Sequence, residues 1–219
     1  LNEGCKFGDE RIGQSTTLTG RSIVRHMSAK VNEAITGEYD HVGQAIRYGD
    51  TDSVYFTAVD MKTDPSYEGF DFTDRAAMVA LYDEVAERAN TSFPDFMQQN
   101  FNTGLERGGI IKAGRELVAS KTLFIKKKKY ACLIYDLEGA RLDADGKPGK
   151  LKVMGLDLKR ADTPKFMQEF LQKLLMGILT GVERETMYGW IAEFREAFKA
   201  RPAWEKGTPR KVNGLTEYG

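Results

Sequence analysis

Residues 45–57 read AIRYGDTDSVYFT, two runs of strand-forming residues around a turn. The runs 45–48 and 53–57 contain β-branched and aromatic residues, and they flank Gly49-Asp50-Thr51-Asp52, which is typical of a tight turn. We therefore predict a β-hairpin over 45–57. Strands joined by such a turn run antiparallel, so the stretch favours an antiparallel sheet.

The hairpin carries two carboxylates, Asp50 and Asp52, at a spacing of two residues. On a strand this spacing puts both side chains on one face, unless the turn redirects one of them. Carboxylates this close repel each other, and a divalent cation relieves the repulsion. Mg²⁺ prefers such oxygen ligands, and a pair of Mg²⁺ ions can promote phosphoryl transfer. A polar turn whose aspartates cap backbone N–H groups is an equally open interpretation.

Helical periodicity is clearest at residues 19–35, where Ile23, Met27, Val31 and Ile35 recur every fourth residue. Gly37 is expected to end this helix. Further helices are predicted from Thr73-Asp74 to about Ala89, around 94–101, from Thr163-Pro164 through Ile178, and over 185–200.

Two further strands are predicted at 110–118 and 122–136, the second cut across by the run Lys126–Lys129. Residues 143–150 predict a hairpin turn, and the tail beyond Arg201 is expected to be irregular. The predicted fold class is α+β: an antiparallel sheet with packed helices, followed by a mostly helical part. Helical periodicity replaces the strand and turn patterns after Leu158, which predicts a domain boundary near Lys159.

The composition of the 219 residues, 41% hydrophobic and 29% charged, is that of a folded domain with a core. No apolar run is long enough to span a bilayer, and no secretory signal follows Leu1. Cys5 and Cys132 lie far apart without metal-ligand spacing, so we expect inert thiols in a reducing compartment.

Charge cancels over the whole chain, with 32 basic and 32 acidic residues, which argues against a protein that simply coats nucleic acid. Its distribution is uneven, because residues 60–106 are mainly acidic whereas residues 107–165 are mainly basic. Such a basic segment can bind a polyanion locally, since charge interactions are short-ranged at physiological salt. Solvent-exposed faces of two different secondary-structure elements would give the same uneven distribution of charge.

Tyr48-Gly49-Asp50-Thr51-Asp52-Ser53 resembles the third palm motif of family B DNA polymerases, and its surroundings resemble the T-even-like phage branch of that family. The resembling stretches occur in the family's order and cover most of the chain up to about Ala200. Asp9–Gly20 and Lys30–Glu33 resemble the segment that joins the fingers to the palm, and Arg115-Glu116 resembles a short acidic site of the palm. Lys127–Ala131 resembles the motif that follows the primer end, and Met154–Asp157 with Thr163–Lys165 resembles the passage into the thumb.

The resemblance implies catalytic roles for the hairpin carboxylates. Asp52 would bind both catalytic metal ions, and Asp50 would be a second, more structural carboxylate beside it. Glu116 would lie close to the metal site in a supporting role, although a surface glutamate remains an equal alternative.

The resemblance also implies contacts with DNA. Lys128 and Tyr130 would contact the primer strand near its 3′ end, with Lys127 and Lys129 on phosphates or in solvent, and Thr51 would add a contact at the hairpin. Thr163 and Lys165 stand at a helix start, where phosphate contact and simple capping are both open.

In family terms, residues 1–158 would be palm, with 1–36 joining fingers to palm and 45–57 as the catalytic hairpin, and residues 159–219 a partial thumb. The earlier palm motif Asp-x-x-Ser-Leu-Tyr-Pro does not occur, nor do the fingers helix and the exonuclease motifs. The chain also begins at Leu1 rather than at Met. We therefore expect a C-terminal part or split subunit of a DNA-directed DNA polymerase, processed or cut from something longer, and inactive alone.

The expected cofactor is Mg²⁺, as two ions whose ligand set is partly supplied by a missing partner. Expected partners are primer–template DNA, deoxynucleoside triphosphates, and an N-terminal polymerase part carrying the exonuclease, first palm motif and fingers. A sliding clamp is a further candidate, no membrane is expected, and the expected location is the cytoplasm of a phage-infected host cell.

Two other functions remain open on the sequence. A non-enzymatic DNA-binding fragment would use the lysine run and thumb helices to hold duplex, without need of Mg²⁺. An unrelated metal-dependent nuclease would be built around Asp50, Asp52 and Glu116, and would release nucleotides from DNA on its own.

Overall fold

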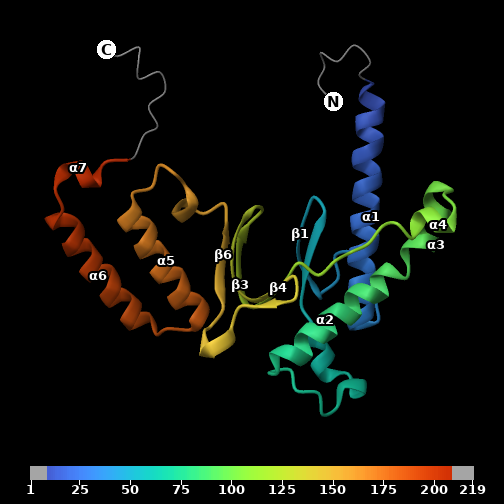
Figure 1. Cartoon of the computed structure of the whole chain (residues 1–219), viewed down its shortest axis with the longest axis horizontal. Helices are drawn as coiled ribbons and strands as arrows, with labels where there is room; N and C mark the ends of the chain where they lie inside the picture. The colour runs from blue at the N-terminus through green and yellow to red at the C-terminus, as the bar shows by residue number, and fades with distance from the viewer. Residues whose placement is uncertain (1–8, 209–219) are drawn as a thin grey trace. The chain divides into compact units, whose positions relative to one another are not determined.

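A computed structural model describes residues 9–208, apart from the side chain of Asp145 (Figure 1). The chain divides into two compact units, unit 1 at residues 1–116 and unit 2 at residues 117–219. This division differs from the predicted boundary near Lys159, because Leu179 from the helical part packs against Ala131 and Leu133 of the second sheet. The palm and thumb assignment of 1–158 and 159–219 stays a prediction. Cys5 and the end of the tail lie outside the described residues.

Unit 1 begins with the long helix α1, Glu10–Thr36, nine residues earlier than the predicted start at Thr19. Asp9 caps it, accepting the backbone N–H of Arg11 at 2.9 Å. Gly37 ends it as predicted: its φ of 81° is left-handed, and its N–H donates to the Glu33 carbonyl.

The rest of unit 1 consists of a two-stranded hairpin and shorter helices. The predicted hairpin is confirmed, since β1 and β2 pair antiparallel. Asp74 also caps the following helix as expected, accepting the Ala76 N–H at 2.8 Å. The elements are β1 Ile46–Asp50, β2 Ser53–Phe56, the 3₁₀ turns η1 Val59–Thr63 and η2 Pro65–Tyr67, and the helices α2 Arg75–Asn90, α3 Phe93–Phe101 and α4 Leu105–Gly108.

The predicted strand at 110–118 is wrong for most of its length. Residues 109–116 are irregular, and only Leu117 and Val118 belong to a strand. The physical reason is that the side chain of Asn90 hydrogen-bonds both backbone groups of Ala113. Its Nδ2 donates to the Ala113 carbonyl at 3.1 Å, and its Oδ1 accepts the Ala113 N–H at 2.7 Å. These backbone groups are therefore bonded to a side chain instead of a neighbouring strand.

The core of unit 1 lies between α1, the base of the hairpin and α2. Val31 and Ile35 from α1 meet Leu81 and Val85 from α2, and Ala45 lies at the start of the hairpin. All five are at most 5% exposed. The hairpin, which is too small to be stable alone, is therefore held by apolar contact with two helices.

Unit 2 is built on a four-stranded antiparallel sheet: β3 Leu117–Lys126, β4 Lys129–Leu137, β5 Ala140–Arg141 and β6 Lys150–Met154. The central strand β4 pairs with β3 and also with both β5 and β6. The predicted single strand over 122–136 is thus a hairpin, because Lys127 and Lys128 form a turn in the middle of it.

The helices of unit 2 form a second layer, in which α5, Lys165–Thr180, packs on the sheet and α6, Arg184–Ala200, packs on α5 (Figure 1). The ring of Phe170 stacks on Phe194 with centroids 3.8 Å apart. Short 3₁₀ turns, η3 Ala144–Gly146 and η4 Asp157–Lys159, join these parts. A short helix, α7 Ala203–Lys206, interrupts the tail that was predicted to be irregular. The fold class is α+β, as predicted.

Candidate functional site

Asp50, Thr51 and Asp52 lie together at the tip of the β1–β2 hairpin. Asp50 is the last residue of β1 and pairs with Ser53, so Thr51 and Asp52 form the turn. Thr51 has a left-handed φ of 43°. Because Asp52 stands in the turn, the two-residue alternation of a strand does not relate its direction to that of Asp50.

The two carboxylates differ in their surroundings. Asp50 is half-buried and accepts a hydrogen bond from the Thr51 hydroxyl at 3.2 Å, while the Ser53 hydroxyl donates to the Asp50 backbone carbonyl. Asp52 is exposed, and its carboxylate makes no hydrogen bond or ion pair within residues 9–208. The tip therefore presents one carboxylate tied to its own turn and one open to solvent.

Aromatic rings support the hairpin behind its tip. Tyr48 and Tyr55 are cross-strand partners, with ring centroids 5.8 Å apart. At the base, Phe56 meets the ring of Tyr82 from α2 edge-on at 5.4 Å. Burial raises the pKa of the Tyr82 hydroxyl, which accepts the Ala58 N–H at 3.5 Å and so stays a neutral anchor at physiological pH.

Glu116 lies at the end of the irregular segment 109–116 and is exposed. Its neighbour Arg115 is 11% exposed in its side chain and is ion-paired with Asp83 of α2 at 2.6 Å. With the Asn90 contacts to Ala113, this pair fastens the segment to α2. Residues 9–208 contain no group of three or more His, Cys, Asp or Glu side chains arranged to hold a metal ion. The supporting role of Glu116 stays a prediction.

The predicted lysine strand is instead the tip of a second hairpin. Lys126 and Lys129 are register partners, and Lys127 and Lys128 form the two-residue turn between them, Lys128 with a left-handed φ of 60°. Lys127 and Lys128 are exposed and Lys129 is half-buried. Tyr130 is only 5% exposed, and its ring lies 5.9 Å from that of Phe124.

Gly155 lies directly against this lysine turn, an approach that no local sequence pattern indicates. A Cβ at position 155 would lie 2.1 Å from the carbonyl oxygen of Lys128, and Gly155 itself has a left-handed φ of 65°. Only glycine fits both the conformation and the close approach. The stretch Met154–Asp157 is therefore packed against the lysine turn through Gly155.

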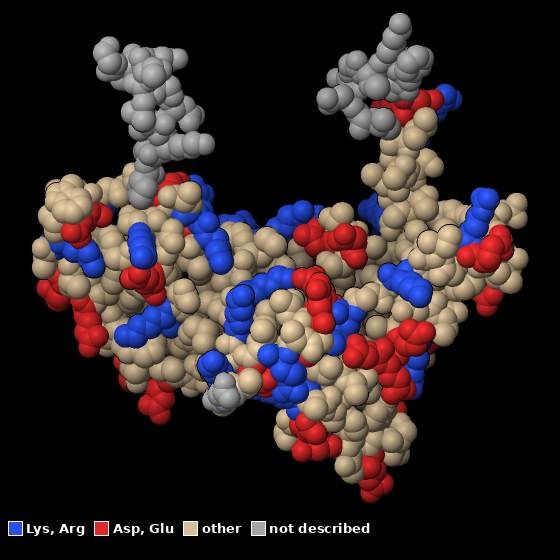
Figure 2. Space-filling view, in the orientation of Figure 1, with Lys and Arg blue, Asp and Glu red and all other residues tan. Residues whose placement is uncertain are grey.

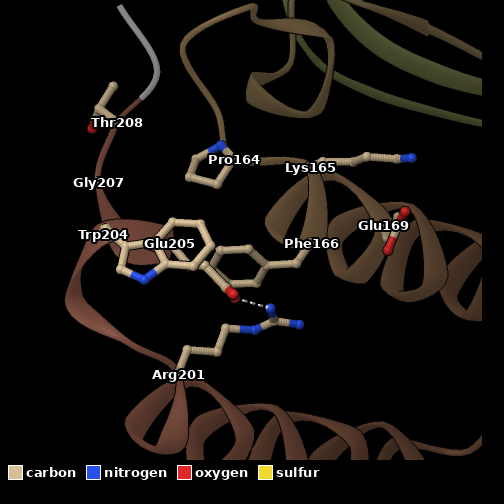
Figure 3. Close-up of a pocket in the computed structure, with 9 residues that line it drawn as sticks. All are labelled: Pro164, Lys165, Phe166, Glu169, Arg201, Trp204, Glu205, Gly207 and Thr208. Carbon is tan, nitrogen blue, oxygen red and sulfur yellow. Dashed lines mark hydrogen bonds and ion pairs between the residues drawn. The ribbon is translucent and has the colours of Figure 1, made fainter.

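Thr163 and Lys165 lie at the start of α5. The Thr163 hydroxyl donates to the Asp157 carbonyl at 2.8 Å and thereby ties η4 to the helix start, and no side chain caps α5. An open pocket of about 650 Å³ lies beside them, and Figure 3 shows the Lys165 side chain extending away from Arg201 and Glu205. Arg201 pairs with Glu205 at 2.6 Å, and Glu169 also lines the pocket, so side chains of both signs surround it.

The two signs of charge are interspersed on the surface drawn in Figure 2. This fits the zero formal net charge of the chain. None of the helices within residues 9–208 combines the length and apolar character that a bilayer crossing requires.

Comparisons with known proteins agree on one family. Residues 6–207 match the sequence model of DNA polymerase family B. The DNA-directed DNA polymerase of Escherichia phage RB69 is 29% identical over an alignment of 188 positions, which covers 81% of this chain and 20% of the relative. That of Enterobacteria phage T4 is 26% identical over an alignment of 226 positions, which covers 97% of this chain and 24% of the relative. The DNA polymerase alpha catalytic subunit of Dictyostelium discoideum is 24% identical over 186 residues, 85% of this chain and 10% of the relative. The chain thus spans about a quarter or less of each relative's length.

Proposed function

The chain belongs to DNA polymerase family B, and from this premise we propose that it is the C-terminal part of a DNA-directed DNA polymerase, supplying the catalytic hairpin, the rest of the palm and the beginning of the thumb. The observation that carries the proposal is the hairpin tip, where Asp50 ends a strand and the exposed Asp52 stands in the turn. The similarity to phage polymerases over most of this chain supports it.

The donor set at the tip suits a hard divalent cation, because carboxylate oxygens are the ligands that Mg²⁺ prefers. Asp52 would hold the ion directly, and Asp50, held by Thr51, would keep the turn in place and add negative charge beside it. Bound Mg²⁺ would supply Lewis-acid stabilisation of the charge that develops during nucleotidyl transfer to a primer 3′-hydroxyl. Two carboxylates are few for two ions, so the remaining ligands would come from another polypeptide segment, with Glu116 in support.

The basic residues of unit 2 would hold the DNA. Lys127 and Lys128 project from a tight turn into solvent, where an ammonium group can reach a backbone phosphate at little cost in desolvation. Lys129 and Tyr130 begin β4 directly after this turn, so they would align the primer end beside it. Lys165, with Thr163 at the start of α5, would add a phosphate contact at the helix N-terminus.

The length of the relatives supports the proposal of further partners. Because this chain spans a quarter or less of them, the first palm motif, fingers and exonuclease would be supplied by an N-terminal polymerase part, as in a split enzyme. Deoxynucleoside triphosphates and primer–template DNA would be bound by the two parts together, and a sliding clamp is a further candidate partner. The phage relatives suggest the cytoplasm of an infected cell as the place of action.

A reconstitution experiment tests the proposal. This chain is mixed with an N-terminal polymerase part, and Mg²⁺-dependent primer extension is measured for the wild type, Asp52→Asn and the control Asp95→Asn on α3. Loss of the metal-binding carboxylate is expected to lower the rate about 10³-fold or more, whereas the control keeps it.

The two other candidate functions are outcomes of the same experiment. An Asp52→Asn mixture that extends primers as fast as the wild type contradicts the proposal. Salt-sensitive duplex binding that is indifferent to Mg²⁺ and to Asp52, without any extension, would favour a non-enzymatic DNA-binding fragment. Release of nucleotides by this chain alone would favour a nuclease.

A further inference from the structure

The β1–β2 hairpin needs an external anchor, since two strands alone are marginal in water. Its open end, opposite the carboxylates, is closed by the Thr57 N–H, which donates to the Ala45 carbonyl at 3.0 Å. Ala45 is fully buried, and its own N–H points back to α1, where Oδ1 of Asn32 accepts it at 3.1 Å. One side chain thus connects the helix to the first rung of the hairpin.

Asn32 is itself fully buried, at 0% exposure. Its amide nitrogen donates both hydrogens, one to the hydroxyl of Thr36 at 3.0 Å and one to the carbonyl of Glu38 at 2.9 Å. With the bond from Ala45, the side chain holds the end of α1, the following loop and the start of β1. No other residue type of this size offers two donors and an acceptor in this arrangement.

The loop that returns from α1 to β1 packs flush against this amide. A Cβ at Gly43 would lie 2.1 Å from Nδ2 of Asn32, and the Gly43 carbonyl accepts the Ile46 N–H at 3.0 Å. Gly43 therefore permits the close approach by which Asn32 reaches the Ala45 N–H. The contact between Gly43 and Asn32 therefore determines the path of the chain into β1.

The register of the hairpin depends on the same place. Ile46 pairs with Phe56 but Tyr48 pairs with Tyr55, so the register shifts at Arg47, two residues after the anchored Ala45. A slip of one residue would turn every side chain of β1 to the opposite face, Asp50 included. The anchor at Ala45 lies at the open end of the hairpin, on the other side of this shift from the carboxylates.

We propose that Asn32 is a positioning residue for the hairpin carboxylates: by holding Ala45, it sets the register that aims Asp50 and the turn carrying Asp52. The role in metal binding rests on the proposed function, whereas the effect on register does not. Asn32 touches neither the carboxylates nor any group expected to react, so it acts only through the backbone of β1.

The test compares Asn32→Asp with Asn90→Asp in the full chain. Each change replaces an amide that holds both a backbone N–H and a backbone carbonyl of a distant loop, but Asn90 holds Ala113 instead of the hairpin. Gly43→Ala is a second variant, which displaces the Asn32 amide without changing any polar group. Amide hydrogen exchange and cross-strand proton contacts report the hairpin, and line broadening by Mn²⁺ reports the carboxylates.

We expect Asn32→Asp and Gly43→Ala to speed amide exchange in β1 and β2 about tenfold or more, and to weaken the Tyr48–Tyr55 cross-strand contacts. We also expect a several-fold higher Mn²⁺ concentration for half-broadening of residues 50–53. Asn90→Asp should leave the amide exchange and the cross-strand contacts of the hairpin unchanged. Unchanged hairpin exchange in the Asn32 and Gly43 variants, or an equal change in Asn90→Asp, overturns the proposal. A wild type that Mn²⁺ does not broaden at 50–53 contradicts the proposed function instead, and the exchange data still decide the role of Asn32.

Discussion

Replacing Gly155 by alanine tests the link between the lysine turn and the stretch that follows β6. The new methyl group would lie 2.1 Å from the Lys128 carbonyl oxygen and must also adopt the left-handed φ of 65°. The obstructing atom belongs to the backbone, so it cannot turn away as the end of a side chain would. Relief therefore requires the lysine turn or the chain at 155 to move.

The size of the effect follows from two contributions. A non-glycine residue in the left-handed region costs about 1–2 kcal/mol, and overpacking against a fixed neighbour adds about 1–3 kcal/mol. Gly139→Ala on the same sheet is the matched control, since it has a φ of 86° and nothing within 4 Å of the added Cβ. The difference between the two variants therefore isolates the clash.

Two assays measure the consequence. Both tryptophans, Trp190 and Trp204, lie in unit 2, so their fluorescence during denaturation follows that unit. Gly155→Ala should lose about 1–3 kcal/mol more than Gly139→Ala. In duplex binding, a displaced turn no longer presents its lysines to the phosphates, and each phosphate that is no longer neutralised should lower the slope of log affinity against log salt by about 0.9.

Equal stability of the two glycine variants would refute the close approach inferred at Lys128. A destabilised Gly155→Ala that binds duplex with the wild-type salt slope would refute the role of the turn in holding DNA.

Two further predictions concern stability. His26 accepts or donates hydrogen bonds at both ring nitrogens, to Tyr39 at 2.8 Å and Ser92 at 2.9 Å, and burial, followed by nearby Lys30, lowers its pKa. The unfolded chain therefore binds the proton first as pH falls, so the stabilisation should be fully present above the ordinary histidine pKa of about 6.5 and decline below it. Denaturation midpoints measured from pH 8 to 5 check this. A His26→Gln variant whose midpoint depends on pH with the same slope would contradict it. Phe170→Ala removes the ring stacked on Phe194 at 3.8 Å, and is expected to cost about 2 kcal/mol and to loosen α6 from α5; Trp190 fluorescence during denaturation checks it, with Tyr188→Ala on the exposed side of α6 as a control that should change little.

Local signals account for the parts of the fold that the sequence predicted well. The 45–57 hairpin, the end of α1 at Gly37 and the cap at Asp74 each depend on residues within a few positions of one another. Such features are encoded by turn chemistry and short hydrogen bonds, which a sequence displays directly. The carboxylate pair of the candidate site belongs to this class, because one turn brings it together.

Two of the wrong predictions involve partners that are distant in sequence, whereas the early start of α1 depends on a local cap, Asp9. The strand expected at 110–118 is absent because Asn90 bonds the backbone of Ala113, twenty-three residues away. The lysine run lies in a turn instead of a continuous strand, against Gly155. The division into two units at 116/117 also depends on a distant contact, because α5 buries Leu179 on the sheet; the palm and thumb boundary near Lys159 stays a prediction.

Patterns along the sequence predicted the helix stripes, the 45–57 turn and the carboxylate pair at its tip. What holds that tip in place depends on tertiary packing, because the contact of Asn32 with Ala45 exists only when α1 and β1 pack together. The reason is physical: periodicity and capping depend on neighbours along the chain, whereas a buried amide is satisfied by groups that folding brings to it.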